Sequence, residues 1–169
     1  MQPVSSVAFA ALSSGALVAT VVDIRVRRIP NTLTATMAGI GVGLAASGVS
    51  GVTLVGSVLG FILGFALMLP GHALGATGAG DVKFMAAVGA IVGPATVVTA
   101  FLFTAVAGGI LALAVAIGRR RLSATLAGTG RLISAPGEVK KEIQAATVSS
   151  RFAYGPAIAI GSVLAALLG

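Results

Sequence analysis

Six apolar segments, separated by short polar stretches, limit the fold of this chain more than any other feature of its sequence. Hydrophobic residues make up 57% of the 169 residues and charged residues only 9%, and so few charges cannot cover a water-soluble domain of this size. A helix that crosses a bilayer needs about 20 apolar residues, with a range of about 17–25. We therefore predict an all-α membrane bundle, polytopic, with about six transmembrane helices at residues 4–22, 32–46, 52–69, 82–92, 95–118 and 152–168.

Charged residues occupy every second connection between these segments. All eleven Lys and Arg, all four Asp and Glu and His72 lie within residues 23–31, 71–83 and 119–151, whereas the turns near residues 47–51 and 93–94 carry no charge. Loops rich in Lys and Arg stay on the cytoplasmic side of a membrane. We expect a single transmembrane domain, residues 1–169, with an internal loop at 119–151 and with the N-terminus and the C-terminus outside.

The composition excludes several kinds of chemistry. No cysteine is present, so disulfides, thiol nucleophiles and Cys-ligated zinc are excluded. One His and four carboxylates make too small a set for a conventional metal site, and we expect neither a metal nor a cofactor. A net charge of +7 that is placed between apolar segments indicates contact with anionic membrane lipids and not with nucleic acid.

Glycines recur at helical spacing in two of the segments. Gly56, Gly60 and Gly64 share one face of the third predicted helix, and Gly89 and Gly93 share a face of the fourth. Small residues four apart let helices approach closely in lipid. With 24 glycines in the chain such spacing also arises by chance, and we favour packing as the explanation.

Asp23 and Asp81 are the only aspartates in the chain, and both fall at the internal ends of predicted helices. Each has an ordinary explanation. Asp23 can be an interfacial carboxylate that pairs with Arg27, four residues further on, and Asp81 can cap the N-terminus of a helix. An acid inside a membrane helix costs about 2.5–3.5 kcal/mol, so two aspartates that face the same side favour a functional pair.

The sequence next to each aspartate is also unusual. Ile29-Pro30 requires extended backbone, and Asn31 or Thr32 can cap the next helix, so the chain turns sharply after the first aspartate. Gly78 and Gly80 precede the second aspartate, and they allow another chain, such as a substrate strand, to approach closely.

Two carboxylates that converge share one proton, because both cannot ionise cheaply at short range. One then acts as a base and the other as an acid, which activates water for amide hydrolysis without a metal or a thiol. Lys83 could stabilise one of the charges or bind a phospholipid, although an ordinary interfacial lysine is the favoured interpretation. A serine mechanism would have to use His72, but no Gly-x-Ser-x-Gly sequence is present, so we interpret His72 as a loop residue.

At these residues the sequence resembles the type IV prepilin peptidases, specifically the short form associated with Tad/Flp-type pili. GxGD alone is weak evidence, but GxGD-Val-Lys at the start of a fourth segment is specific when an Asp-x4-Arg-Ile-Pro-Asn sequence follows the first. The resemblance covers nearly the whole chain. It is carried by Asp23 with Arg28-Ile29-Pro30-Asn31, by Gly78-Ala79-Gly80-Asp81-Val82-Lys83 with Gly89 and Gly93 beyond, and by Arg151-Phe152-Ala153-Tyr154-Gly155-Pro156.

The resemblance implies an intramembrane aspartic endopeptidase of the GxGD type. Its substrate would be a prepilin or pseudopilin, cut at the cytoplasmic face of a prokaryotic cytoplasmic (inner) membrane. Longer family members carry a segment with zinc-binding cysteines and also methylate the new N-terminus; this chain has no cysteine, so we expect cleavage alone. The implied catalytic residues are Asp23 and Asp81, and the implied supporting residues are Gly78, Gly80, Lys83, Arg28, Pro30 and Asn31.

Two non-enzymatic alternatives remain at this point. The chain could be a transporter or channel subunit that binds cations or protons at its two aspartates, as intramembrane acids often do. It could also be a pilus assembly factor that binds a pilin without cutting it. A pair of aspartates in the middle of the membrane favours transport, and a pair at the internal face favours a peptidase.

Overall fold

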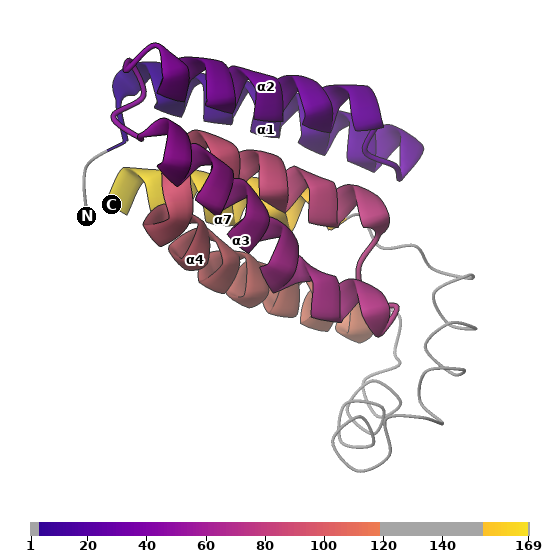
Figure 1. Cartoon of the computed structure of the whole chain (residues 1–169). Coiled ribbons are helices and arrows are strands. Elements are labelled where there is room, and N and C mark those ends of the chain that lie inside the picture. Colours follow the sequence, from indigo (N-terminus) through magenta and orange to yellow (C-terminus); the bar gives the residue numbers. More distant parts are fainter. Residues whose placement is uncertain (1–3, 119–153, 169) are drawn as a thin grey trace.

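The computed structural model describes residues 4–118 and 154–168, and helix is the only regular secondary structure in this part of the chain (Figure 1). The prediction of an all-α fold is therefore confirmed. The predicted internal loop at 119–151 lies outside the described residues, as do the first two residues of the last predicted segment. Within the described ranges the helices are α1 (Ser6–Val26), α2 (Asn31–Ala46), α3 (Leu54–Ala73), α4 (Ala79–Gly118) and α7 (Gly155–Leu168).

The chain reverses direction at each described connection, so that neighbouring helices lie side by side (Figure 1). α1 and α2 lie together above the other helices in this view, and the start of α1 and the end of α7 both lie at the left. This up-and-down course brings the end of α1 and the beginning of α4 to the same side of the bundle, at the right.

A break at Gly93 divides α4 into two halves, as the sequence Gly93-Pro94 predicted. Gly93 has φ 79° and ψ 177°, a conformation that favours glycine, and Pro94 has no N–H to continue the helix. The first half, residues 79–92, therefore ends there, and residues 94–118 run back beside it (Figure 1).

A serine from α3 compensates for the hydrogen bond that the break removes. In a continuous helix the carbonyl of Ala90 would accept from the N–H of residue 94, but Pro94 has none. Ser57 Oγ, which is fully buried, donates to that carbonyl at 2.7 Å. The break is thus satisfied from the neighbouring helix, as a buried carbonyl requires.

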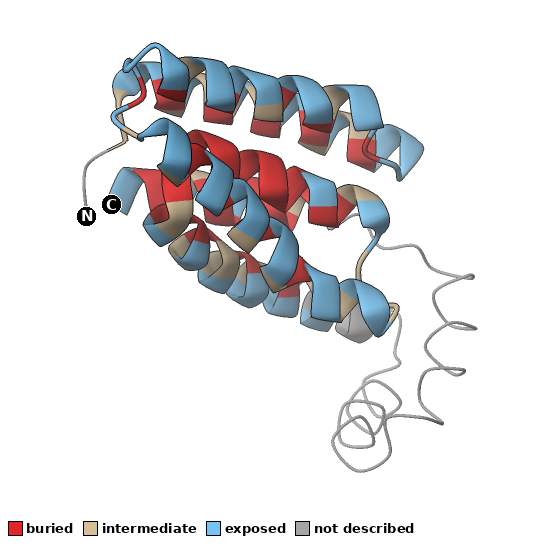
Figure 2. Cartoon of the chain, viewed as in Figure 1, coloured by how far each residue is buried: buried red, intermediate tan, exposed pale blue. Residues whose placement is uncertain are grey.

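The first half of α4 is the centre of the core. Its residues from Asp81 to Val92 are buried, apart from Lys83, and they appear as the red ribbon between the other helices in Figure 2. α2, α3 and α7 all pack extensively against α4, whereas α1 packs mainly against α7 and touches α4 at few points. α7 is therefore the main link between α1 and the core.

Glycines set the close distance between α3 and α4. A Cβ atom at Gly60 would meet the carbonyl of Gly89, and a Cβ atom at Gly64 would lie 2.5 Å from the carbonyl oxygen of Met85. The predicted packing face is confirmed at these positions. Gly93 also lies against Gly60, where a Cβ atom would be 2.9 Å from the Gly93 carbonyl carbon, although the helix breaks at Gly93. Gly56 faces mainly its own N-terminal turn.

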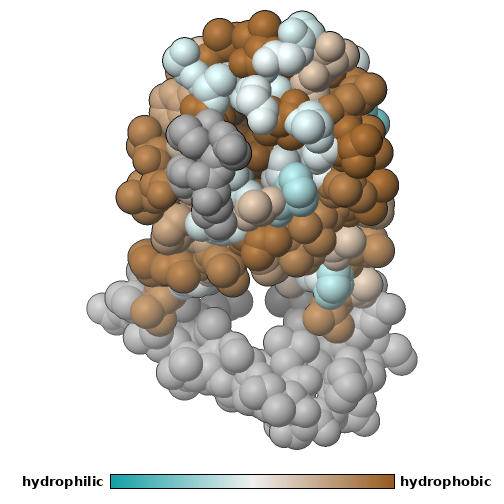
Figure 3. Space-filling view, turned by 60° about the vertical axis from the view of Figure 1, so that its left-hand side comes forward, coloured by the Kyte–Doolittle hydropathy of each residue, from teal (hydrophilic) through white to brown (hydrophobic). Residues whose placement is uncertain are grey.

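The outer surface of the bundle is apolar. Three of the described helical stretches are long and apolar enough to cross a membrane: Ser6–Val26, Leu54–Ala73 and Ala79–Leu111. Large hydrophobic side chains on these stretches are exposed, among them Leu17, Val55 and Ile110 at 65–68%. Figure 3 shows such side chains in brown along the flanks, with paler, more polar ones over the end that faces the viewer. This surface is that of a membrane protein.

The largest differences from the predicted helix ends are at α1 and α3, which end four residues later, and at α4, which begins three residues earlier, at Ala79. α1 continues four residues beyond Val22, because the basic residues that follow remain helical until Arg27 adopts the left-handed conformation (φ 52°) and ends the helix. α3 continues past Pro70 to Ala73. A proline in the last turn removes one hydrogen bond, and this does not prevent the turn from closing at Leu74, whose N–H donates to the Pro70 carbonyl at 3.0 Å.

Candidate active site

The two aspartates lie at the same end of the bundle, where α1 ends and α4 begins (Figure 1). Asp23 is in the last turn of α1 and Asp81 in the first turn of α4, and the two side chains are only 5% and 7% exposed. They are close enough for the charge of Asp23 to act on Asp81. The structure thus brings together two residues that are separated by two complete helices, α2 and α3, in the sequence.

Asp23 is held by main-chain contacts on both sides. The backbone N–H of Arg27 donates to the Asp23 carbonyl at 2.7 Å, which closes the left-handed end of α1. The Asp23 carboxylate accepts a hydrogen bond from the backbone N–H of Gly155, the first residue of α7, with a distance of 2.8 Å to Oδ2. A buried carboxylate with such a donor keeps a fixed orientation.

Asp81 does not occupy the N-cap position that was its ordinary explanation. It is the third residue of α4, and its Oδ2 accepts from the backbone N–H of Gly78, one residue before the helix, at 2.8 Å. An acid at this position satisfies a free N–H of the helix start, as in a capping box. The hydrogen bond turns the carboxylate back towards the connection between α3 and α4.

The two sequence motifs that flank the aspartates are in contact. A Cβ atom at Gly80 would lie 3.2 Å from the Cβ of Ile29 and 3.3 Å from its carbonyl oxygen, so only a residue without a side chain fits easily there. Lys83 Nζ donates to Asn31 Oδ1 at 2.8 Å. These contacts join the connection between α1 and α2 to the start of α4, and thereby fix the end of α1 near Asp81.

This geometry corrects the predicted roles of three residues. Asn31 was expected to cap α2, and so was Thr32, but the N-cap is Pro30 and no side chain caps the helix. The Asn31 amide oxygen instead accepts from Lys83, which is why Lys83 is more than an ordinary interfacial lysine. Arg28 is exposed in the same connection, and among the described residues no hydrogen bond links it, or Pro30, to either aspartate.

Two residues at the start of α7 belong to the site although their role was not predicted. Gly155 contacts Asp23, and the Tyr154 ring lies against Gly108, where a Cβ atom would be 2.5 Å from the phenol oxygen. The Tyr154 phenol is also close enough to Asp81 for the negative charge of that carboxylate to act on it. The only signal in the sequence was the Tyr154-Gly155-Pro156 run, which periodicity and charge do not single out.

His72 also faces this end of the bundle. Its Nδ1 lies 3.0 Å from the carbonyl oxygen of Thr77. The interpretation of His72 as a loop residue is wrong, because His72 lies in the last turn of α3, from which its side chain contacts the connection between α3 and α4. Within residues 4–118 and 154–168, no group of three or more His, Asp or Glu side chains could hold a metal ion.

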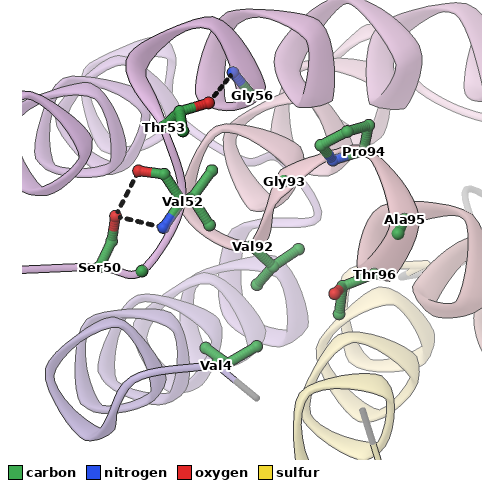
Figure 4. Close-up of a pocket in the computed structure, with 11 residues that line it drawn as sticks. Val4, Ser50, Val52, Thr53, Gly56, Val92, Gly93, Pro94, Ala95 and Thr96 are labelled. Atoms are coloured by element: carbon green, nitrogen blue, oxygen red, sulfur yellow. Dashed lines mark hydrogen bonds between the residues drawn. The ribbon is translucent and has the colours of Figure 1, made fainter. Parts of the chain in front are cut away.

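The pocket shown in Figure 4 lies at the opposite end of the bundle from the aspartates. It has a volume of about 310 Å³ and is lined by the connection between α2 and α3, by the break in α4 and by Val4. The figure shows Val52, Val92 and Thr96 around it. This pocket therefore contains neither of the two aspartates.

Comparison with known protein families gives one match. The model of the type IV leader peptidase family matches residues 10–113, more than half of the chain. Among curated proteins and solved structures, none matches. The matched range contains Asp23, Asp81 and the contacts between their motifs, and it ends before α7.

Proposed function

The chain belongs to the type IV leader peptidase family, and we propose that it is an aspartic endopeptidase that removes the leader peptide of a type IV prepilin. The proposal is carried by one observation: the two aspartate-bearing motifs pack on each other, through Gly80 against Ile29 and through Lys83 and Asn31. This contact holds two buried carboxylates within electrostatic range at one end of an apolar bundle.

In the proposed mechanism Asp23 and Asp81 share one proton. The ionised carboxylate takes a proton from a water molecule as the water oxygen attacks the carbonyl carbon of the scissile amide. The protonated carboxyl donates to the carbonyl oxygen, and a proton then passes to the leaving nitrogen as the carbon–nitrogen bond breaks. Since both carboxylates are buried, their electrostatic effect on the reacting groups is stronger than it would be in water.

The charge pattern supports a site at the cytoplasmic face. All seven titratable side chains in the charged connections of the described part, at residues 23, 25, 27, 28, 72, 81 and 83, lie in or next to the two connections at the aspartate end. By the positive-inside rule this end is cytoplasmic. We propose six spans in a prokaryotic inner membrane, with both termini outside; the halves of α4 count as two spans.

The proposed substrate is a prepilin or pseudopilin of the Tad/Flp type, which the sequence resemblance favours. The cut would fall between a short leader and the hydrophobic helix of the mature pilin. That helix can lie in the bilayer while the cleavage point reaches the aspartates at the membrane face. We propose cleavage alone, without methylation of the product, and no nucleic-acid partner.

The position of the aspartates favours a peptidase over a transporter. A proton or cation carrier needs its acids near the middle of the membrane. Asp23 and Asp81 lie instead in a last and a first helical turn, next to the exposed residues Gly78 and Ala79, where a substrate from the aqueous side can approach.

Co-expression with a Tad-type prepilin tests the proposal. Mass spectrometry of the pilin should show a loss of the leader mass only in cells that contain the peptidase. The matched control is the same chain with Asp81→Asn, which removes ionisation and keeps the size of the side chain. An uncut prepilin beside a well-inserted wild-type protein would contradict the proposed function for that class of substrate.

A further inference from the structure

The first residue of α7 is built against the carboxylate of Asp23. The Gly155 N–H donates to Asp23 Oδ2 at 2.8 Å, in a buried position. A Cβ atom at Gly155 would lie 2.8 Å from the same oxygen and 3.0 Å from the Asp23 Cβ. Any side chain at residue 155 would therefore collide with the carboxylate that its backbone holds.

α7 also determines where Asp23 lies relative to Asp81. α1 packs mainly on α7 and only weakly on α4, whereas α7 packs extensively on α4. The packing of α7 therefore largely determines where α1 lies relative to the core. The contact between Gly155 and Asp23 lies at the point where this link reaches the proposed catalytic pair.

We propose that Gly155 is a positioning residue of the peptidase site. Its amide fixes the orientation of the Asp23 carboxylate, and the absence of a side chain lets α7 begin directly against that carboxylate. The inference rests on the proposed function and extends the site to a helix beyond the range that the family model matches. Gly155 acts through Asp23 and does not touch the substrate.

The consequence of adding one methyl group follows from the distances. In Gly155→Ala the new carbon must move from 2.8 Å to at least about 3.4 Å from Asp23 Oδ2 to reach an ordinary contact, and the Asp23 Cβ blocks the same direction. A displacement that approaches 1 Å at a catalytic group can cost about 100-fold in rate. We expect kcat to fall by roughly 10- to 100-fold with KM within about twofold, because the substrate-binding surfaces are unchanged.

Two other glycines provide matched controls. Gly161, on the same helix, packs against Thr104, so Gly161→Ala disturbs the contact between α7 and α4 without reaching Asp23. Gly109 has no neighbouring atom within 4 Å of the position that a Cβ atom would take, so Gly109→Ala should keep wild-type kcat and should not lower the thermal midpoint. A merely structural role of Gly155 would make Gly155→Ala behave like Gly161→Ala, with lowered thermal stability and a normal kcat for the folded fraction.

The experiment measures kcat and KM on a purified prepilin, together with the thermal midpoint of each variant in detergent. A fall in kcat at unchanged KM in Gly155→Ala, but not in the two controls, supports the proposal. Wild-type kcat in Gly155→Ala overturns it. If the wild-type protein cleaves no prepilin, the proposed function fails, and the thermal measurements below still decide whether the contact exists.

A double-mutant cycle covers the case in which Gly155→Ala folds poorly. Asp23→Gly removes the three atoms that lie nearest to the new methyl group, which are Oδ2, Cβ and Cγ of Asp23. Gly155→Ala should then lower the thermal midpoint in the wild-type background and leave it nearly unchanged in the Asp23→Gly background. An equal decrease in both backgrounds would mean that the methyl group does not act through Asp23, and it would overturn the inference.

Discussion

Gly60→Ala tests the close packing of α3 against the first half of α4. The added Cβ atom would overlap the carbonyl of Gly89 and lie 2.9 Å from the carbonyl carbon of Gly93. Both are backbone atoms of the most buried helix, so the clash cannot be relieved by turning a side chain. The two helices have to separate, and the contacts along their shared face weaken.

Two contributions of opposite sign determine how much Gly60→Ala changes the free energy of unfolding. Overpacking in a dense core costs about 1–3 kcal/mol, while replacing Gly by Ala inside a helix gains up to about 1 kcal/mol through backbone entropy. Gly43→Ala in α2 gains the backbone entropy without any overpacking, because nothing lies within 4 Å of its Cβ position. The difference between the two variants therefore isolates the clash, and we expect Gly60→Ala to be about 1–3 kcal/mol less stable than Gly43→Ala.

Thermal unfolding in detergent measures this difference. The chain has no Trp and one Tyr, so circular dichroism of the helices is a better probe than intrinsic fluorescence. For a chain of this length 1 kcal/mol corresponds to about 2–4 °C, which predicts a midpoint roughly 2–12 °C lower in Gly60→Ala than in Gly43→Ala. Equal midpoints would refute the reasoning that glycine sets the distance between α3 and α4.

Three further predictions concern the break in α4, the contact between the motifs and the topology. Ser57→Ala leaves the carbonyl at the break without its donor and should lower stability by about 1–2 kcal/mol, and an unchanged thermal midpoint would contradict this. Asn31→Leu should reduce kcat by roughly 2- to 10-fold, since an exposed hydrogen bond contributes about 0.5–1.5 kcal/mol. Asn31→Asp keeps an acceptor for Lys83 and should retain more activity. Similar losses in both variants would argue against the contact between Asn31 and Lys83. Val49→Cys and Leu74→Cys, each in a chain without native cysteine, should react with an impermeant maleimide from opposite sides of the membrane, and labelling from one side would exclude the six-span arrangement.

Much of the fold could be predicted because a membrane leaves a chain few choices. Apolar segments of limited length become helices, and Gly93-Pro94 fixes a break because one residue favours an unusual backbone conformation and the next lacks an N–H. Spacing also predicted that Gly60 and Gly89 lie on packing faces of their helices, but not that the two faces meet each other. Helix ends were less predictable, since polar and basic residues can continue a helix for another turn, as they do from Asp23 to Val26.

The site was predicted only in part. Two rare acids in an apolar chain stand out, and so does the GxGD sequence, so Asp23 and Asp81 could be found from residue type. The hydrogen-bond donor to Asp23 could not be found from the sequence. It is a backbone N–H 132 residues away, and every residue except proline has a backbone N–H. The role of Asn31 was misassigned for a related reason: its local capping position was visible in the sequence, whereas its distant partner Lys83 was not.

The most direct test of the central claim is the loss of one ionisable group at each aspartate. Asp23→Asn and Asp81→Asn keep the size of the side chain, so both variants should insert normally, and mass spectrometry should find the co-expressed prepilin uncut. Glu138→Gln and Glu142→Gln change the only other acids in the chain and should leave cleavage intact. The wild-type protein should show a bell-shaped dependence of rate on pH, because one carboxyl must be ionised and the other protonated. Removal of the leader by a well-inserted Asp81→Asn or Asp23→Asn variant would contradict the catalytic pair.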